Sequence, residues 1–213
     1  MIFLNKFCYC CGRPSSEVVC SDCQKLLSKS QEGGCRICAR PLWGLNDTCW
    51  ACRDNELVVK KIMAPYYYEG LAKILFQEYK FNRGWSLTPF WVKSLFSVWE
   101  DLDYTLVPIP PKKSSLEKRG WDPVEHLWKR LCAFKITGKK LFYPISSAEQ
   151  KLLNRSQRKY NLSGIKLIST AIPQKIVLLD DTVTTGSTLN AFAKILLEHG
   201  AHEVLGLALT LAP

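Results

Sequence analysis

Two adjacent carboxylates, Asp180 and Asp181, stand between an apolar run and a short hydroxyl-rich turn. The run 175–179 has the composition of a buried strand, and the residues after the turn follow helical spacing. Backbone N–H groups at a helix start have no intrahelical partner, and the helix dipole favours an anion there. The carboxylates suit sugar hydroxyls or a hydrated Mg²⁺ beside such an anion. The predicted chemistry is therefore the binding of a phosphorylated sugar.

The turn after the carboxylates supplies the donors for a phosphate. Gly186 lets the backbone approach a phosphate closely or adopt a positive φ. The arrangement resembles the motif by which type I phosphoribosyltransferases bind phosphoribosyl pyrophosphate (PRPP), two acids followed by Val-x-Thr-Thr-Gly-x-Thr, with Thr182 in place of the usual valine. A strand, an acidic turn and a capped helix also occur without any ligand, but the complete arrangement favours a site. The predicted phosphate-binding residues are Thr182, Val183, Thr184, Thr185, Gly186, Ser187 and Thr188.

Four Cys-x-x-Cys pairs follow one another near the start of the chain. Two such pairs complete a tetrahedral Cys₄ site for Zn²⁺, which has no open position for a substrate and is therefore structural. Sequential pairing is the simplest, and the spacing also allows a cross-braced pairing. Cys10 interrupts the pattern. The eight predicted ligands of two structural zinc ions are Cys8, Cys11, Cys20, Cys23, Cys35, Cys38, Cys49 and Cys52.

The cysteines define a module, because nine of the ten lie within residues 8–52. Zinc replaces the hydrophobic core that a segment of about 50 residues can scarcely supply. We predict a zinc-ribbon module at 1–56 and a second domain at 57–213. No apolar run approaches the ~18 residues of a membrane span, and the opening residues are too short for a signal peptide. We therefore expect a cytoplasmic protein with reduced thiols.

Strand and helix patterns alternate through the rest of the chain, which predicts an α/β fold with a parallel sheet flanked by helices. Ligands of such sheets bind beyond the carboxyl ends of the strands, where the acidic pair falls. The predicted strands are 57–68, 104–110, 175–179 and 203–211, and the predicted helices cover 71–76, 90–99, a stretch beginning near 122, and 188–199.

The net charge of +10 is concentrated in residues 111–160, which contain 13 Lys and Arg against 4 Asp and Glu. Basic grooves with aromatic platforms bind single-stranded nucleic acid. The same composition also fits a solvated helix face whose aromatic residues lie in the core. The aromatic residues of this stretch are Trp121, Trp128, Phe134, Phe142, Tyr143 and Tyr160.

Several segments occur together in the order found in the ComF family. They are Tyr68-Glu69-Gly70, Lys80-Phe81, Val107-Pro108-Ile109-Pro110, Arg119-Gly120-Trp121 and the acidic motif. The chain thus resembles a family that joins a double zinc ribbon to a type I phosphoribosyltransferase domain. The resemblance implies binding of PRPP with Mg²⁺ and a role in handling incoming single-stranded DNA during natural transformation.

The resemblance also implies roles for individual residues. Asp180 and Asp181 become the catalytic pair, which holds the ribose hydroxyls and metal-bound water, and the loop 184–188 binds the 5′-phosphate. The chain departs from the family's Arg-Gly-Phe-Asn-Gln at Trp121-Asp122-Pro123, which removes two amide side chains. The pyrophosphate region contains Lys112, Lys113 and Arg119, and the segment that closes over the site contains Gln150, Arg158 and Asn161.

Three functions remain open on the sequence. The first is a DNA-uptake factor on a PRPP-binding scaffold, and the second is an active phosphoribosyltransferase with an unknown acceptor. The third is a zinc-based adaptor that docks on a DNA-translocation motor protein. None of His126, His199 and His202 stands in a pattern that marks a general base.

Overall fold

The structure is a computed structural model that describes residues 7–30, 33–42, 46–54, 57–99, 103–145, 164–169 and 171–213. The three residues assigned to a closing segment, Gln150, Arg158 and Asn161, lie outside the described residues.

A parallel sheet forms the centre of the molecule. Its order is β1 (Ile62–Met63), β7 (Glu203–Leu211), β6 (Lys175–Val183) and β3 (Thr105–Pro108), and β2 (Tyr66–Tyr67) pairs with β7 beyond β1. Successive side chains of β6 and β7 enter two separate cores, one on each face of the sheet. The first half of β6, at 176–179, and nearly all of β7 are apolar because both faces of these strands are buried. The predicted parallel α/β sheet is confirmed.

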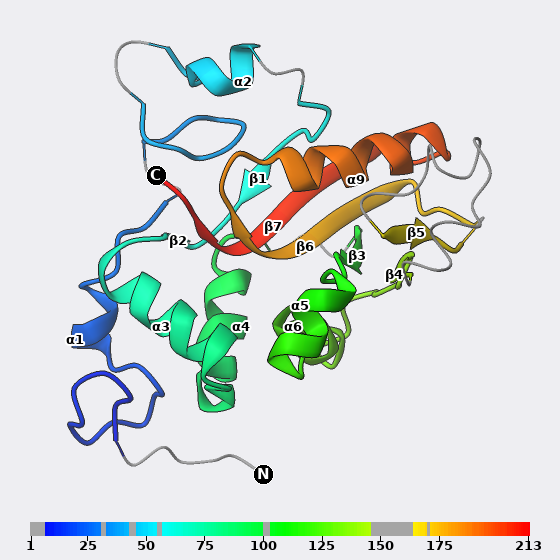
Figure 1. Ribbon diagram of the computed structural model, residues 1–213. Helices are drawn as coiled ribbons and strands as arrows, with labels where there is room; N and C mark the ends of the chain where they lie inside the picture. Colours follow the sequence, from blue (N-terminus) through cyan, green and yellow to red (C-terminus); the bar gives the residue numbers. More distant parts are fainter. Residues whose placement is uncertain are drawn as a thin grey trace.

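Helices cover both faces of this sheet (Figure 1). Helix α9 (Ser187–Glu198) connects β6 to β7 and covers one face, while α3 (Gly70–Phe81), α4 (Thr88–Phe96) and α6 (Pro123–Cys132) cover the other. A short 3₁₀ helix, η1 (Trp85–Leu87), joins α3 to α4. None of the described helices has the length and apolar character needed to cross a membrane.

Two elements differ from the sequence expectation. The basic stretch after Pro110, where no helix was predicted, forms helix α5 (Lys113–Arg119), which is capped by Gly120 with φ +72°. This helix buries none of its residues, so it has no apolar stripe that sequence periodicity would detect. The other addition is the antiparallel pair of β4 (Phe142–Pro144) and β5 (Ile165–Leu167).

The two cysteine groups lie on opposite faces of the sheet (Figure 1). The first group, which includes α1 (Ser21–Gln24), shares its core with α3 and α4 through Cys8 and Cys23. The second, which includes α2 (Trp50–Asp54), shares the core beneath α9. Each group therefore packs against a different helical layer, and the division at residue 56 stays a prediction.

Candidate functional site

The eight cysteines of the Cys-x-x-Cys pairs form two groups whose Sγ atoms lie within 4.8 Å of one another. That spacing fits four thiolates around one tetrahedral Zn²⁺. The pairing is sequential, which excludes the cross-braced alternative for these residues. Cys10 belongs to neither group. The first group is Cys8, Cys11, Cys20 and Cys23, and the second is Cys35, Cys38, Cys49 and Cys52.

Backbone amides prepare one thiol in each group for metal binding. Burial alone would raise the pKa of Cys8, but backbone N–H groups, that of Cys20 foremost, lower it to about 6. The same competition lowers the pKa of Cys35 to about 7. Burial raises the pKa of Cys23 and Cys38. Because thiolates are the ligands, metal binding to either group must release protons.

A cleft of about 590 Å³ opens at the carboxyl ends of β3 and β6, beside the start of α9. Val183 is buried at the end of β6, Lys113 is exposed at the start of α5, and the loop residues 184–186 lie between the lining residues Thr182 and Ser187 in the chain. The predicted site residues that line the cleft are Asp180, Asp181, Thr182, Ser187, Thr188, Lys112 and Arg119.

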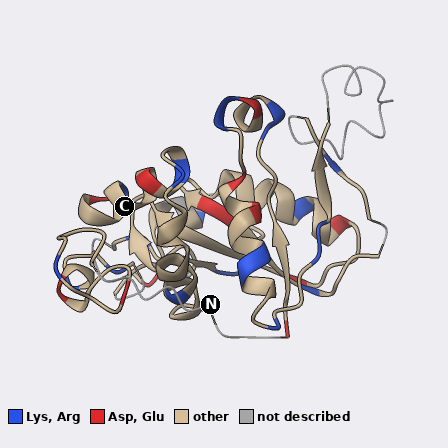
Figure 2. Ribbon diagram, turned by 90° about the horizontal axis from the view of Figure 1, so that it is seen from below, with Lys and Arg blue, Asp and Glu red and all other residues tan. Residues whose placement is uncertain are grey.

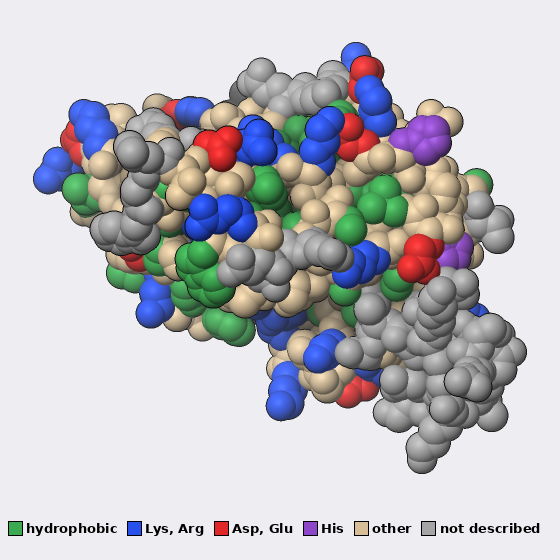
Figure 3. Space-filling model, turned by 90° about the horizontal axis from the view of Figure 1, so that it is seen from above, with side chains coloured by type: hydrophobic (Ala, Val, Ile, Leu, Met, Phe, Trp, Pro, Cys, Tyr) green, Lys and Arg blue, Asp and Glu red, His purple; other side chains and the backbone are tan. Residues whose placement is uncertain are grey.

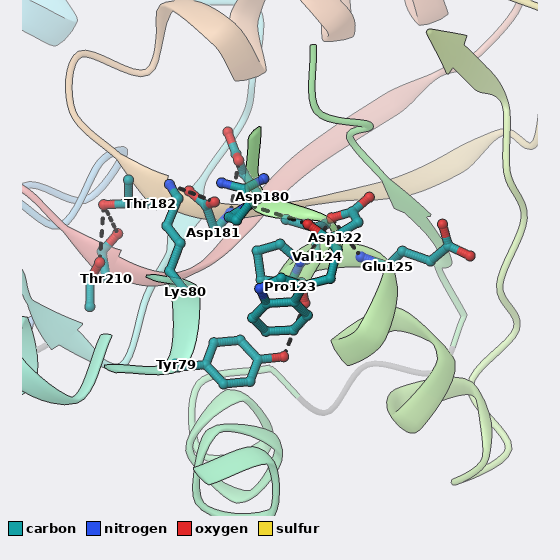
Figure 4. Close-up of polar contacts among 12 residues, drawn as sticks. Tyr79, Lys80, Asp122, Pro123, Val124, Glu125, Asp180, Asp181, Thr182 and Thr210 are labelled. Carbon is teal, nitrogen blue, oxygen red and sulfur yellow. Dashed lines mark hydrogen bonds and ion pairs between the residues drawn. The ribbon is translucent and has the colours of Figure 1, made fainter. Parts of the chain in front are cut away.

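Lys80 lines the cleft, although the sequence motifs predicted no role for it. It projects from the last turn of α3, and its Nζ lies 2.7 Å from Asp181 Oδ2 (Figure 4). Both side chains are less than one-fifth exposed, so Lys80 places a compensating positive charge beside the acidic pair in a partly desolvated cleft. The pKa of Asp180 rises to about 7 through burial and then through the charge of Asp181.

Thr182, which replaces the usual valine of the motif, has a hydrogen-bond partner on the next strand. The hydroxyl of Thr210, directly opposite on β7, donates to Thr182 Oγ1 across 3.0 Å (Figure 4). Thr210 is completely buried, so Thr182 provides a hydrogen-bond acceptor for a buried hydroxyl group.

The loop predicted to bind phosphate depends on one glycine. Gly186 has φ +77° immediately before α9, and a Cβ there would lie 3.2 Å from Ile62 Cδ1. A side chain would therefore meet both backbone strain and crowding. The Thr185 hydroxyl accepts from the Ser187 backbone N–H at 3.3 Å and donates to the Ser187 hydroxyl at 2.8 Å. The loop presents the start of α9, with Ser187 and Thr188, to the cleft.

The second cysteine group contacts this loop directly. The Arg40 guanidinium donates to the backbone carbonyl of Thr184. Arg40 is itself fixed by the metal-binding turn, because its carbonyl accepts from the Cys35 N–H at 2.7 Å. A side chain anchored by the turn thus holds the peptide of the phosphate loop.

The motif predicts PRPP binding, and replacing Arg40 by Met is expected to weaken it about 10-fold to 30-fold, the effect of about 1.5–2 kcal/mol for a lost hydrogen bond from a charged group. Arg36→Met is the matched control, since Arg36 is exposed and pairs with Asp47 in the same cysteine group. Isothermal titration calorimetry with PRPP and Mg²⁺ measures both variants. Equal affinities would show that the Arg40 contact does not shape the loop.

Asp122, where the family motif has Asn, also lines the cleft. Its Oδ1 accepts from the backbone N–H groups of Val124 at 2.9 Å and Glu125 at 3.2 Å, which caps α6 (Figure 4). The helix start predicted near this residue is confirmed. Burial raises the pKa of Asp122. The cleft therefore holds a third carboxyl group beside the acidic pair.

The described aromatic residues of the basic stretch are divided between the interior and the surface, where Phe134 and Tyr143 are exposed. The Trp128 indole donates to the Leu106 carbonyl at 3.0 Å, and the Phe142 ring packs 4.6 Å from that of Phe192. The described Lys and Arg residues are spread over many elements (Figure 2). Acidic and basic side chains are interspersed on the face above α9 (Figure 3). The described part of 111–160 does not by itself form a continuous basic and aromatic groove.

Comparison with known proteins adds sequence similarity over most of the chain, while no family model matches. The chain is 25% identical to competence protein ComFC of Streptococcus pneumoniae, over 90% of this chain and 87% of that protein. It is 28% identical to competence protein ComFC of Bacillus subtilis, over 86% and 80%. The chain is thus similar over most of its length to two competence proteins named ComFC. Competence protein F of Haemophilus influenzae is a third ComF relative, 23% identical over 87% of both chains. The family resemblance drawn from the motifs is confirmed, and the two Cys₄ groups fit its double zinc ribbon.

Proposed function

We propose that the cleft binds the ribose 5-phosphate group of PRPP with Mg²⁺, and that the protein handles incoming single-stranded DNA on this scaffold during DNA uptake. The observation that carries the proposal is the cleft itself, which brings the acidic pair and the start of α9 together. The relatives are named competence proteins, which supports a role in DNA uptake.

Each part of the ligand has a chemically suited partner in the cleft. The start of α9 with Ser187 and Thr188 suits the 5′-phosphate. The carboxylates of Asp180 and Asp181 suit the ribose hydroxyls, and their oxygens fit the ligand preference of Mg²⁺. Lys112 and Arg119 line the side next to α5 and suit the pyrophosphate. Mg²⁺, when bound with PRPP, supplies positive charge for the pyrophosphate.

An active phosphoribosyltransferase is the second candidate, and Asp122 favours it. No histidine lies among the described cleft residues, whereas this carboxyl group does, with its pKa raised by burial. An acid with a raised pKa is suited to accept a proton from an acceptor molecule. In that case Asp122→Asn should stop turnover while PRPP still binds.

An adaptor role for the cysteine module is the third candidate. Phe7 and Leu26 of the first Cys₄ group are 62% and 71% exposed, and such side chains suit a protein contact. The partner expected for this role is a DNA-translocation motor protein. Loss of that contact in Leu26→Ser, with zinc retained, would support it.

Calorimetry with PRPP–Mg²⁺ and with single-stranded DNA, each in the presence of the other, tests the leading proposal. We expect both ligands to bind, and the DNA affinity to fall steeply as salt rises, because phosphate contacts release counterions. Competition between the ligands places both at the cleft, while independent binding separates their sites. Absence of PRPP binding, or of DNA binding at low salt, would remove the corresponding half of the proposal.

A further inference from the structure

We propose that single-stranded DNA crosses the corner formed by Phe81, Arg83 and Trp85, at the end of α3 and the start of η1. This inference rests on the proposed DNA handling and assigns it a surface outside the stretch 111–160. The Phe81 and Trp85 side chains are 58% and 53% exposed. They are separated along the chain by Arg83, which is also exposed. We call these three residues the α3 corner.

Trp85 is a supported platform. Its ring stacks on His126 with 6.4 Å between centroids and 14° between planes, and it meets the Trp121 ring edge to face at 6.2 Å. His126 is held in turn by the Thr88 hydroxyl at 3.1 Å. A ring fixed from below, with more than half of the side chain exposed, suits the face of an unpaired base.

Arg83 occupies a backbone conformation that favours glycine. Its φ is +56°, within a turn in which Asn82 and Gly84 both donate to the Glu78 carbonyl. An L-residue is strained in this region, and glycine would relieve the strain. The guanidinium extends towards the turn between α5 and α6, since a Cβ on Gly120 would lie 3.0 Å from Arg83 Nη2. An arginine at a position where glycine would be less strained is consistent with a binding role for the arginine side chain.

The charges around the α3 corner favour a polyanion. Neither Arg83 nor Arg130, one turn beyond His126, forms an ion pair with a described residue. Of the nearby acids, Glu125 pairs with lysines of α6 and the following loop, and Glu78 accepts hydrogen bonds from the neutral donors Tyr9 and Asn82 and so leaves one negative charge beside the two arginines. The free cations beside exposed rings match alternating phosphates and bases, whereas a purely apolar partner would leave the cations unpaired.

The α3 corner also continues into the cleft. Lys80 Nζ lies 5.6 Å from the centre of the Phe81 ring while it pairs with Asp181 on the cleft floor. On the other side, Arg119 lines the cleft and donates from Nε to the Trp121 carbonyl at 3.2 Å. A strand lying on Trp85 and Phe81 would therefore reach the mouth of the cleft.

Fluorescence anisotropy with a labelled oligothymidylate of about 30 nucleotides tests the surface in the full-length protein. We expect Trp85→Ala to weaken binding about fivefold to 150-fold, and an abasic strand of equal length to bind wild type and this variant alike. Arg83→Gly should weaken binding to both strands. It should also reduce the slope of log affinity against log salt by about 0.7, the contribution of one phosphate contact.

The controls come from the opposite end of α6. Phe134 is 62% exposed, and Lys135 is exposed with φ +67°. Phe134→Ala and Lys135→Gly thus make comparable changes within the stretch 111–160, the loss of an exposed ring and of a cation at positive φ, and we expect both variants to bind as wild type. Trp85→Phe, which keeps a ring, should retain most of the affinity and guards against a folding defect.

The outcomes separate this inference from the function on which it rests. If wild type binds DNA and both Trp85→Ala and Arg83→Gly bind it equally well, DNA does not bind at the α3 corner, while the proposed DNA handling is unaffected. If the Phe134 and Lys135 variants lose as much affinity as the corner variants, the surface is not specific and the inference fails. If wild type binds no single-stranded DNA at low salt, both fail.

Discussion

Asp180→Asn is expected to lower the affinity for PRPP–Mg²⁺ about 100-fold while making the folded protein more stable. The loss arises because an amide cannot supply the charge that the ribose hydroxyls and Mg²⁺ favour, and hydrogen bonds to charged groups are each worth about 1.5–3 kcal/mol. The gain in stability arises because Asp180, which is only partly exposed, is desolvated beside the charge of Asp181, and both effects raise its pKa to about 7. Calorimetry measures the first effect and thermal unfolding the second.

The stability difference should depend on pH with a definite sign. The folded-state pKa of about 7 lies above the ordinary value of 3.8. Between these values the folded protein binds more protons than the unfolded chain, so wild-type stability falls as pH rises through this window. The Asp180→Asn variant has no carboxyl group to ionise at this position, so this fall in stability with pH is absent from the variant. The free energy of unfolding of the variant should equal that of wild type near pH 4 and exceed it by about 1 kcal/mol or more above pH 7, which corresponds to a rise in Tm of about 2–4 °C.

Asp181→Asn provides the contrasting variant. It leaves Lys80, 16% exposed, without its partner, and breaking a buried ion pair costs about 3–5 kcal/mol. Asp181→Asn with Lys80→Met should recover most of that stability without recovering PRPP binding. If Asp180→Asn binds PRPP as wild type does, the acidic pair does not hold the ligand.

The parts of this site that lie close together in sequence were predictable. The apolar run before Asp180 predicts a buried strand because both faces of β6 are covered. The start of α6 was predictable because Asp122 is a capping residue and Pro123 follows it. The Cys-x-x-Cys spacing predicts metal ligands for a similar reason, since two thiolates of one turn can reach the same ion.

The parts contributed by distant segments were not predictable. Lys80 lies 101 positions before Asp181, and Arg40 is 144 positions from Thr184. Their contacts depend on how α3 and the second cysteine group pack on the sheet, which no local pattern encodes. The metal pairing was open for the same reason, because equal spacing allows more than one arrangement of the four pairs.

The placement of the two cysteine groups on opposite faces of the sheet gives them different expected effects on the cleft. The second group includes the turn that holds Arg40 against the phosphate loop, whereas the first packs against α3 and α4. Cys38→Ser should therefore lower the zinc content from two ions to one and lower PRPP affinity about tenfold or more. Cys23→Ser should remove the other ion and leave PRPP affinity within about twofold of wild type.

Both cysteine variants should be clearly less stable than wild type, because Cys23 and Cys38 are buried within the two cores that flank the sheet. A loss of about 3–5 kcal/mol corresponds to a fall in Tm of about 6–20 °C for a chain of this size. Metal analysis by mass spectrometry and thermal unfolding measure both effects. Cys10→Ser is the matched control, since Cys10 lies outside both groups and should keep two zinc ions. If Cys23→Ser and Cys38→Ser reduce PRPP affinity equally, the second group has no particular hold on the loop, and zinc acts through global stability.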